Sequence, residues 1–184
     1  MKTLRMAIAG LVCLAALAAT GQDTSGAKKK ASGKKAAHAD QHVAIAPADV
    51  KWGDPPPVFP KGAKFAVLDG DPGKTGAFTV RLQAPDGYKV MPHWHPTAEF
   101  VTVISGEFHI GMGDSVDATK ETTLPAGGFV SLPARMNHYA WVKGETVLQI
   151  NSTGPFAMNY VNPADDPSGM QGKKKASKSA KTAK

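Results

Sequence analysis

The chain has 184 residues with a formal net charge of +7, and 42% of its residues are hydrophobic, which fits a single globular domain. The charge is unevenly placed. Residues 51–170 carry nine Lys and Arg against twelve Asp and Glu, a net charge of −3, whereas residues 1–50 carry +4 and residues 171–184 carry +6. Because the basic residues gather at the ends, the composition argues against a domain that binds nucleic acid specifically.

The amino terminus has the pattern of an export signal. Lys2 and Arg5 supply a positive start, residues 6–19 form an uncharged and largely apolar run, and Ala16-Leu-Ala18 offers a small-x-small cleavage site. We predict a signal peptide over residues 1–19 and a periplasmic or extracellular protein. A buried amino-terminal helix and an uncleaved anchor are the alternatives. The only cysteine lies in the apolar run, so the mature chain would contain no disulfide.

Both ends of the mature chain are rich in Lys, Ala, Ser and Gly and lack apolar periodicity. This composition predicts a disordered basic linker over residues 20–50 and a disordered Lys-rich tail over residues 167–184. Solvated ends without a specific partner are the preferred interpretation, because blocks of like charge are commonly solvated. Weak attraction to an anionic surface is the alternative.

Residues 51–166 contain short apolar segments separated by turn-forming residues, and none of these segments keeps a 3.6-residue period. Besides a strand that carries His93 and His95, we expect strands at residues 65–68, 77–82, 99–104, 107–112, 122–124, 129–132, 138–142, 146–151 and 156–161. Many short strands with turn signals every 8–12 residues predict an all-β sandwich or barrel.

Three potential metal ligands fall within seven residues. They are His93, His95 and Glu99. The two histidines are two residues apart, so on an extended strand both imidazoles point to the same face. Pro96 interrupts the strand and allows a turn, and we expect residues 99–104 to run back beside the histidine strand. Two imidazoles and one carboxylate on one face are a site for a divalent transition metal.

A second stretch, residues 127–142, reads as a strand, a Pro-containing turn and another strand, with His138 just after the turn. His138 shares a strand face with Ala140, whereas Tyr139 takes the other face. The small side chain at position 140 would leave space beside a metal. From these residues alone, a neutral core histidine is the alternative to a ligand.

Together the two stretches resemble the paired motifs of the cupin superfamily. The first motif, G-x5-H-x-H-x3-E-x6-G, is matched at every fixed position, by Gly87, His93, His95, Glu99 and Gly106. The second, G-x5-P-x-G-x2-H-x3-N, is matched by Gly127, Pro133 and His138. Arg135 stands where that motif has glycine, and Val142 where it has asparagine.

The resemblance implies a double-stranded β-helix, or jelly-roll cupin barrel, that holds one metal ion by His93, His95, Glu99 and His138. The ion would be Mn, Fe, Ni, Cu or Zn, because this ligand set does not distinguish among them. Arg135 would stand in the turn at the barrel mouth, where its guanidinium could bind a carboxylate substrate. A solvated turn residue is the alternative there. Tyr139 is a second candidate for substrate contact.

These features favour an exported, metal-dependent oxidoreductase that acts on a small organic acid or phenol. Its catalytic candidates are Glu99, Arg135 and Tyr139. A non-catalytic cupin module that binds a metal or small ligand is the runner-up, and a metal-free interaction protein is third, because a fold alone does not define a function. A homodimer is a further expectation.

The remaining histidines are not expected to bind the metal. His38 and His42 lie in the predicted linker. His109 shares a strand face with Glu107, whereas Phe108 and Ile110 take the opposite face. We therefore expect His109 to face away from the barrel interior.

Overall fold

The structure is a computed structural model that describes residues 42–169. The predicted signal peptide, most of the predicted linker and the last part of the predicted tail lie outside these residues. The linker's final residues are exposed as far as Val50, which is buried, and they include the short 3-10 helix η1 (Pro47–Asp49). Among the described residues, no helix has the length and hydropathy needed to span a membrane.

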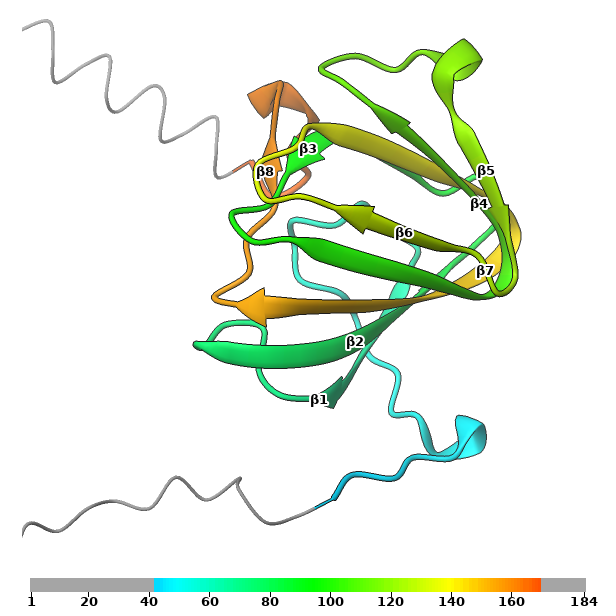
Figure 1. Cartoon of the computed structure of the whole chain (residues 1–184), viewed down its shortest axis with the longest axis vertical. Helices are drawn as coiled ribbons and strands as arrows, with labels where there is room; N and C mark the ends of the chain where they lie inside the picture. The colour runs from blue at the N-terminus through cyan, green and yellow to red at the C-terminus, as the bar shows by residue number, and fades with distance from the viewer. Residues whose placement is uncertain (1–41, 170–184) are drawn as a thin grey trace, which may run out of the picture. The chain divides into compact units, whose positions relative to one another are not determined.

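The described part of the chain is an antiparallel β-structure, which confirms the all-β prediction (Figure 1). Its strands are β1 (Lys64–Asp69), β2 (Gly76–Ala84), β3 (Lys89–Trp94), β4 (Glu99–Met112), β5 (Thr122–Pro125), β6 (Phe129–Leu132), β7 (His138–Gly154) and β8 (Asn159–Tyr160). Two further 3-10 helices are η2 (Ala118–Lys120) and η3 (Pro163–Asp165). The predicted domain bounds, residues 51–166, enclose all eight strands.

Strand β7 is the centre of the sheet, with 17 residues and three partner strands. Its first part lies between β3 and β4, so that Ala140 is opposite Val90 on one side and Ile110 on the other. Its second part lies between β2 and β4, so that Ile150 is opposite both Val80 and Val101. One long strand therefore joins the histidine strand to the strand that begins with Glu99.

This arrangement corrects the expected pairing of residues 99–104 with the histidine strand. Strand β4 pairs with β5, β6 and β7, whereas β3 pairs with β7 and β8. The turn between them is tied to the far end of β7, because the Ser152 hydroxyl donates to the Ala98 carbonyl at 2.6 Å and lies 3.1 Å from the Thr97 hydroxyl. The turn around Pro96 is a crossover and not a hairpin.

Strands β4 and β7 are each continuous where the sequence predicted two strands. The register of β4 against β7 shifts on both sides of Ser105, which lets the strand bend without ending. Gly106 adopts a φ of 83°, and a Cβ there would collide with the Thr146 side chain and backbone. Glycine at this position permits both the left-handed backbone and the close approach of β4 to β7.

The core lies inside the barrel, on the alternating inward faces of the strands. Its buried apolar residues include Phe78, Val80, Leu82, Val101, Val103, Phe108, Ile110, Leu132, Val142, Leu148 and Ile150. Phe108 and Ile110 are buried in this core, whereas His109 between them stacks on Trp141. The predicted alternation of residues 107–112 is therefore confirmed.

The proline-rich segment before β1 is attached to the barrel by two tyrosines. The Tyr88 hydroxyl donates to the Pro60 carbonyl at 2.8 Å, and the Tyr160 hydroxyl donates to the Val58 carbonyl at 2.9 Å. Burial raises the pKa of both phenols above its usual value, so both remain donors over the physiological range. These bonds fix the backbone on either side of Phe59, whose ring packs 5.9 Å from that of Phe65.

Candidate metal centre

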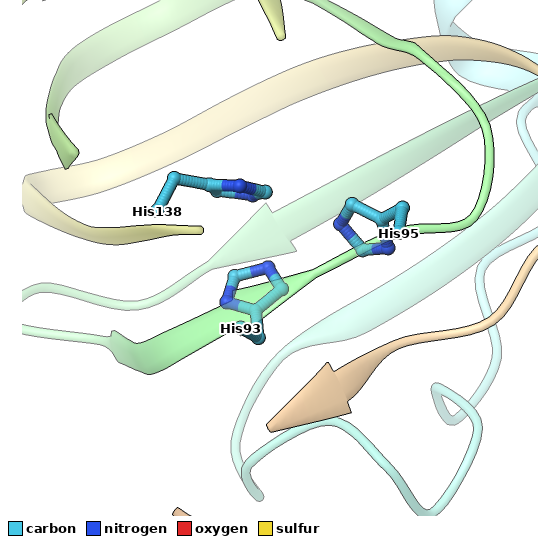
Figure 2. Close-up of side chains that lie close together, drawn as sticks. All are labelled: His93, His95 and His138. Atoms are coloured by element: carbon cyan, nitrogen blue, oxygen red, sulfur yellow. The ribbon is translucent and has the colours of Figure 1, made fainter. Parts of the chain in front are cut away.

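Four polar side chains meet inside the barrel, where their neighbours are apolar. His93 lies in β3, His95 follows that strand, and Glu99 and His138 begin β4 and β7. All four are buried, with 2–7% of their surface exposed. His93 is directly opposite His138 in the β3–β7 ladder. Figure 2 shows the three imidazoles turned toward one another.

The spacing of these side chains suits one small cation. One nitrogen from each histidine lies within 4.8 Å of the other two. The Glu99 Oε2 atom lies 3.4 Å from His95 Nε2 and 3.5 Å from His138 Nε2. Ligands bound at about 2.1 Å with tetrahedral angles are ~3.4 Å apart, and trans ligands are ~4.2 Å apart. The two distances from Glu99 fall in this range, and the imidazole nitrogens lie close enough to reach it with small side-chain shifts.

The other nitrogen of each imidazole bonds to a backbone carbonyl. The Nδ1 atom of His93 lies 2.7 Å from the Met91 oxygen, that of His95 lies 2.9 Å from the Ala157 oxygen, and that of His138 lies 3.0 Å from the Met136 oxygen. A carbonyl only accepts, so each Nδ1 is the protonated nitrogen. In its neutral form, a ring held in this way presents the Nε2 lone pair, which is how metal-binding histidines are held.

The electrostatics of the cluster also favour a bound cation. His95 Nε2 is buried without a hydrogen-bond partner. When the ring is neutral, its lone pair faces a Glu99 carboxylate oxygen. Two acceptors then lie side by side without a donor, an arrangement that a positive charge between them would stabilise. Burial raises the pKa of the Glu99 carboxyl, whereas positive charge on the adjacent His138 and His95 rings lowers it well below its usual value. With both rings neutral, a cation bound between them would supply that charge.

His93 stays neutral for a related reason. Burial lowers the pKa of its imidazole to about 3, and repulsion from the imidazoles of His138 and His95 adds to this effect. A neutral imidazole beside an ionised carboxylate is the protonation state that a divalent ion requires of its ligands. The residues present therefore fit a metal ion.

A small apolar cavity of about 50 Å³ adjoins the cluster. Apart from His93, Glu99 and His138, its lining is apolar: Phe59, Leu82, Val90, Val101, Phe108, Ile110, Ala140, Leu148, Ile150 and Met158. The Phe156 ring stacks on that of His95, with centroids 4.2 Å apart and planes at 20°. This wall limits the space beside the imidazoles to one or two molecules of the size of water.

The structure does not bring Arg135 into the cluster. Its guanidinium lies over the Trp94 ring, with the Cζ atom 5.7 Å from the ring centroid. Its backbone N–H donates to the His95 carbonyl at 2.8 Å, and its φ of 65° is the left-handed value that suits the glycine of the cupin motif. Arg135 therefore supports the position of His95 through its backbone, and its side chain lies on the outer face.

Tyr139 also lies away from the cluster, on the opposite face of β7 from His138. Its hydroxyl donates to the Asp117 carbonyl at 2.8 Å and accepts from the Asp117 N–H at 2.9 Å. Its ring lies against Gly111, where a Cβ would collide with it. Tyr139 anchors the loop that contains η2, and its side chain does not enter the histidine cluster.

The sequence interpretation missed the residues that orient the imidazoles. Two of the carbonyl acceptors, at Met91 and Met136, each stand two residues before the histidine that they bind, and this repeated spacing was a usable signal. Phe156 and Ala157 come from the segment after β7, about 60 residues from His95. No local pattern marks them.

The jelly-roll barrel and the inward-facing histidine cluster define a protein of the cupin class. The sequence model of the ChrR cupin-like domain family matches residues 40–157. The chain belongs to this family. In a search of curated proteins, no sequence matched.

Solved structures with the same fold include the polyketide cyclase RemF from Streptomyces resistomycificus, with a TM-score of 0.57 and 16% identity over 70% of this chain and 91% of that one. Another is a "putative acetylacetone dioxygenase" from Methylibium petroleiphilum, with a TM-score of 0.53 and 19% identity over 69% of this chain and 85% of that one. At these identities the likeness establishes the fold and not the activity.

Proposed function

We propose that the chain is an exported metal-binding cupin in which His93, His95, His138 and Glu99 hold one divalent transition metal ion. The observation that carries this proposal is the set of three buried imidazoles, each with Nδ1 bonded to a carbonyl and Nε2 left for a ligand. We further propose that it acts as an oxidoreductase on a small organic acid or phenol. The dioxygenase named among the structural neighbours is consistent with this chemistry.

The chain's own residues would prepare this centre for chemistry. Glu99 supplies the single negative charge that offsets part of the charge of the ion. The three backbone carbonyls keep the rings oriented, so little reorganisation is needed when the ion binds. The apolar lining of the cavity would lower the local dielectric beside the ion. When bound, a metal with four protein ligands would supply Lewis-acid or redox chemistry at its remaining positions.

A non-catalytic metal- or ligand-binding module is the second candidate. One observation favours it: among the described residues that line the cavity, none but the proposed ligands can donate or accept a proton in catalysis. The two other catalytic candidates, Arg135 and Tyr139, have their side chains outside the cluster. A module of this kind needs only the ligands and a shaped cavity.

Reconstitution with individual ions separates the two candidates. The metal-free chain is loaded in turn with Mn, Fe, Ni, Cu and Zn, and bound metal, oxygen uptake and consumption of a panel of acids and phenols are measured. An oxidoreductase should turn over with one or more redox-active ions and lose that activity with zinc. Full occupancy without turnover across the panel would favour the binding module. Failure to bind any of the ions would refute the oxidoreductase and the metal-binding module.

Export and the basic ends belong to the same proposal. If the amino terminus is a signal peptide, the intact mass of the exported protein should correspond to a chain that begins near residues 19–22. A mature chain that still contains Cys13 would contradict export with cleavage. We propose no specific partner for the Lys-rich ends beyond weak attraction to anionic surfaces, and a homodimer remains a proposal that sedimentation analysis can test.

A further inference from the structure

A second apolar cavity, here called the aromatic chamber, lies next to the metal centre. Its volume is about 120 Å³. The lining residues are Pro56, Val58, Phe59, Phe65, Pro72, Phe78, Val80, Ile150, Phe156, Ala157 and Met158. Four aromatic rings therefore face one space, and the lining contains no ionisable side chain. Such a space suits an apolar group.

The aromatic chamber and the cavity beside the histidines share a wall made of side chains. Phe59, Ile150 and Met158 line both spaces. Phe156, which lines the chamber, also stacks on the imidazole of His95. Because the shared wall includes these side chains, a ligand could occupy both spaces if the side chains rearranged.

Two of these three wall residues come from segments outside the long strands. Phe59 belongs to the proline-rich segment, whose carbonyls at Val58 and Pro60 accept hydrogen bonds from two barrel tyrosines. Met158 lies between β7 and β8. Both side chains are only half-buried, whereas Ile150 is buried in the core. A methionine has three rotatable side-chain bonds and adapts its shape readily, so Phe59 and Met158 form the adjustable part of the wall.

We propose that the aromatic chamber binds the apolar tail of an organic acid whose carboxylate binds at the histidine cluster, and that Phe59 and Met158 set the size of the tail. The volumes support this division. An apolar cavity of about 150 Å³ holds benzene, so a chamber of about 120 Å³ suits one phenyl or branched aliphatic group. The cavity of about 50 Å³ beside the ligands suits a carboxylate. This inference rests on the proposed metal site and specifies its substrate class.

Three probes test the proposal on the full chain, in its zinc-loaded and metal-free forms. Phenylacetate carries both the carboxylate and the apolar tail, acetate carries only the carboxylate, and toluene carries only the apolar group. Calorimetry should show that zinc-loaded protein binds phenylacetate about 10- to 100-fold more tightly than acetate, the gain expected from burying a side chain the size of Phe. Toluene should bind both forms with similar affinity.

A matched pair of variants tests whether the apolar tail of the ligand binds in the chamber. Ala157 is exposed and lines the chamber, and Ala126 is exposed in the turn between β5 and β6, away from both cavities. Ala157→Phe should abolish toluene binding and reduce the preference for phenylacetate over acetate to less than about 3-fold, because the new ring occupies the chamber. Ala126→Phe should leave both unchanged.

A variant with a smaller side chain in the wall provides the complementary test. This test does not require the Ala157→Phe variant to fold. Phe59→Ala should improve the binding of 1-naphthylacetate to zinc-loaded protein by about 10-fold, and zinc content should remain the same as in the unchanged chain. Equal affinities for phenylacetate and acetate, or toluene binding that Ala157→Phe leaves unaltered, would overturn the proposal while the metal site stands. If neither zinc nor any of the other four ions binds, the proposed metal site fails, and the proposal for the organic acid that rests on it fails too. Toluene binding to the metal-free chain then decides only whether the chamber accepts an apolar group.

Discussion

Two histidine environments lie on opposite faces of the same sheet, and each contains a glutamate. Inside the barrel, His93, His95 and His138 surround Glu99. Outside, the Nε2 atom of His109 lies 3.0 Å from Glu107 Oε1, and its ring stacks on Trp141 with centroids 3.8 Å apart. The residue types are the same, but the nitrogen atoms are used differently.

The difference lies in which ring atoms already have partners. Inside, a backbone carbonyl binds one nitrogen of each histidine, and the other nitrogen faces a shared space. Outside, both nitrogens of His109 have side-chain partners, since Nδ1 lies 3.1 Å from the Thr123 hydroxyl. Lys143 lies 3.5 Å from Glu107 and already offsets its charge. A histidine beside a glutamate indicates a metal site only when one imidazole nitrogen is left for the ion.

The largest expected effect follows from removing an interior imidazole. His95→Ala leaves three of the four proposed ligands and should weaken zinc binding at least ~100-fold, more than the loss of an outer-sphere hydrogen bond does. His109→Ala, the matched control on the outer face, should bind zinc as the unchanged chain does. Competition with a chromophoric chelator measures both. Equal zinc affinity in the two variants would contradict the distinction between the faces.

The two glutamates provide a second, smaller contrast. Glu99→Gln keeps the shape of the side chain but removes the only anionic ligand, so manganese affinity should fall about 10-fold more than zinc affinity, because Mn depends more on oxygen ligands. Glu107→Gln should change neither affinity. Titration of each metal-free variant with the two ions tests this. A uniform loss of both metals in Glu99→Gln would show that the carboxylate does not select the ion.

On the outer face the expected changes are in stability and not in metal binding. Tyr139→Phe removes the hydroxyl that bonds both backbone groups of Asp117 and should lower the free energy of unfolding by about 1 to 2 kcal/mol. Zinc stoichiometry should stay the same. Urea unfolding with metal analysis measures both quantities. Loss of zinc with unchanged stability would instead assign Tyr139 to the metal centre.

The smallest effect is expected at Arg135. Arg135→Gly relieves a left-handed backbone that costs roughly 1 kcal/mol in a residue with a Cβ. It also removes the contact with Trp94, and glycine raises the conformational entropy of the unfolded chain. These two losses of stability offset the gain. The unfolding free energy should therefore change by less than about 0.5 kcal/mol, with metal affinity preserved. A fall of several-fold in carboxylate affinity would support Arg135 as a substrate contact.

The spacing of His93, His95 and Glu99 predicted three members of the cluster, and the resemblance to the cupin motifs supplied His138. These residues lie at strand ends, and strand alternation determines which face they take. The alternation of Phe108, His109 and Ile110 likewise predicted that His109 faces outward. Predictions of this kind hold because they depend on neighbours within a few residues.

Predictions that depended on distant partners held less well. Pro96 suggested a hairpin, but Ser152, more than 50 residues away, ties that turn to β7. Strand alternation put Tyr139 on the face away from His138, yet only the structure shows that Asp117 binds its hydroxyl. Phe156 reaches His95 from the segment after β7. A single sequence specifies none of these long-range contacts by its local pattern.

X-ray absorption at the zinc edge, on the full chain loaded with one equivalent of zinc, tests the shared metal site most directly. If the four side chains bind one ion, the spectrum should contain three imidazoles and one carboxylate oxygen at about 2.0 to 2.2 Å, and His138→Ala should lose one imidazole. A spectrum dominated by water oxygens, or one that His138→Ala leaves unchanged, would contradict a metal centre inside the barrel.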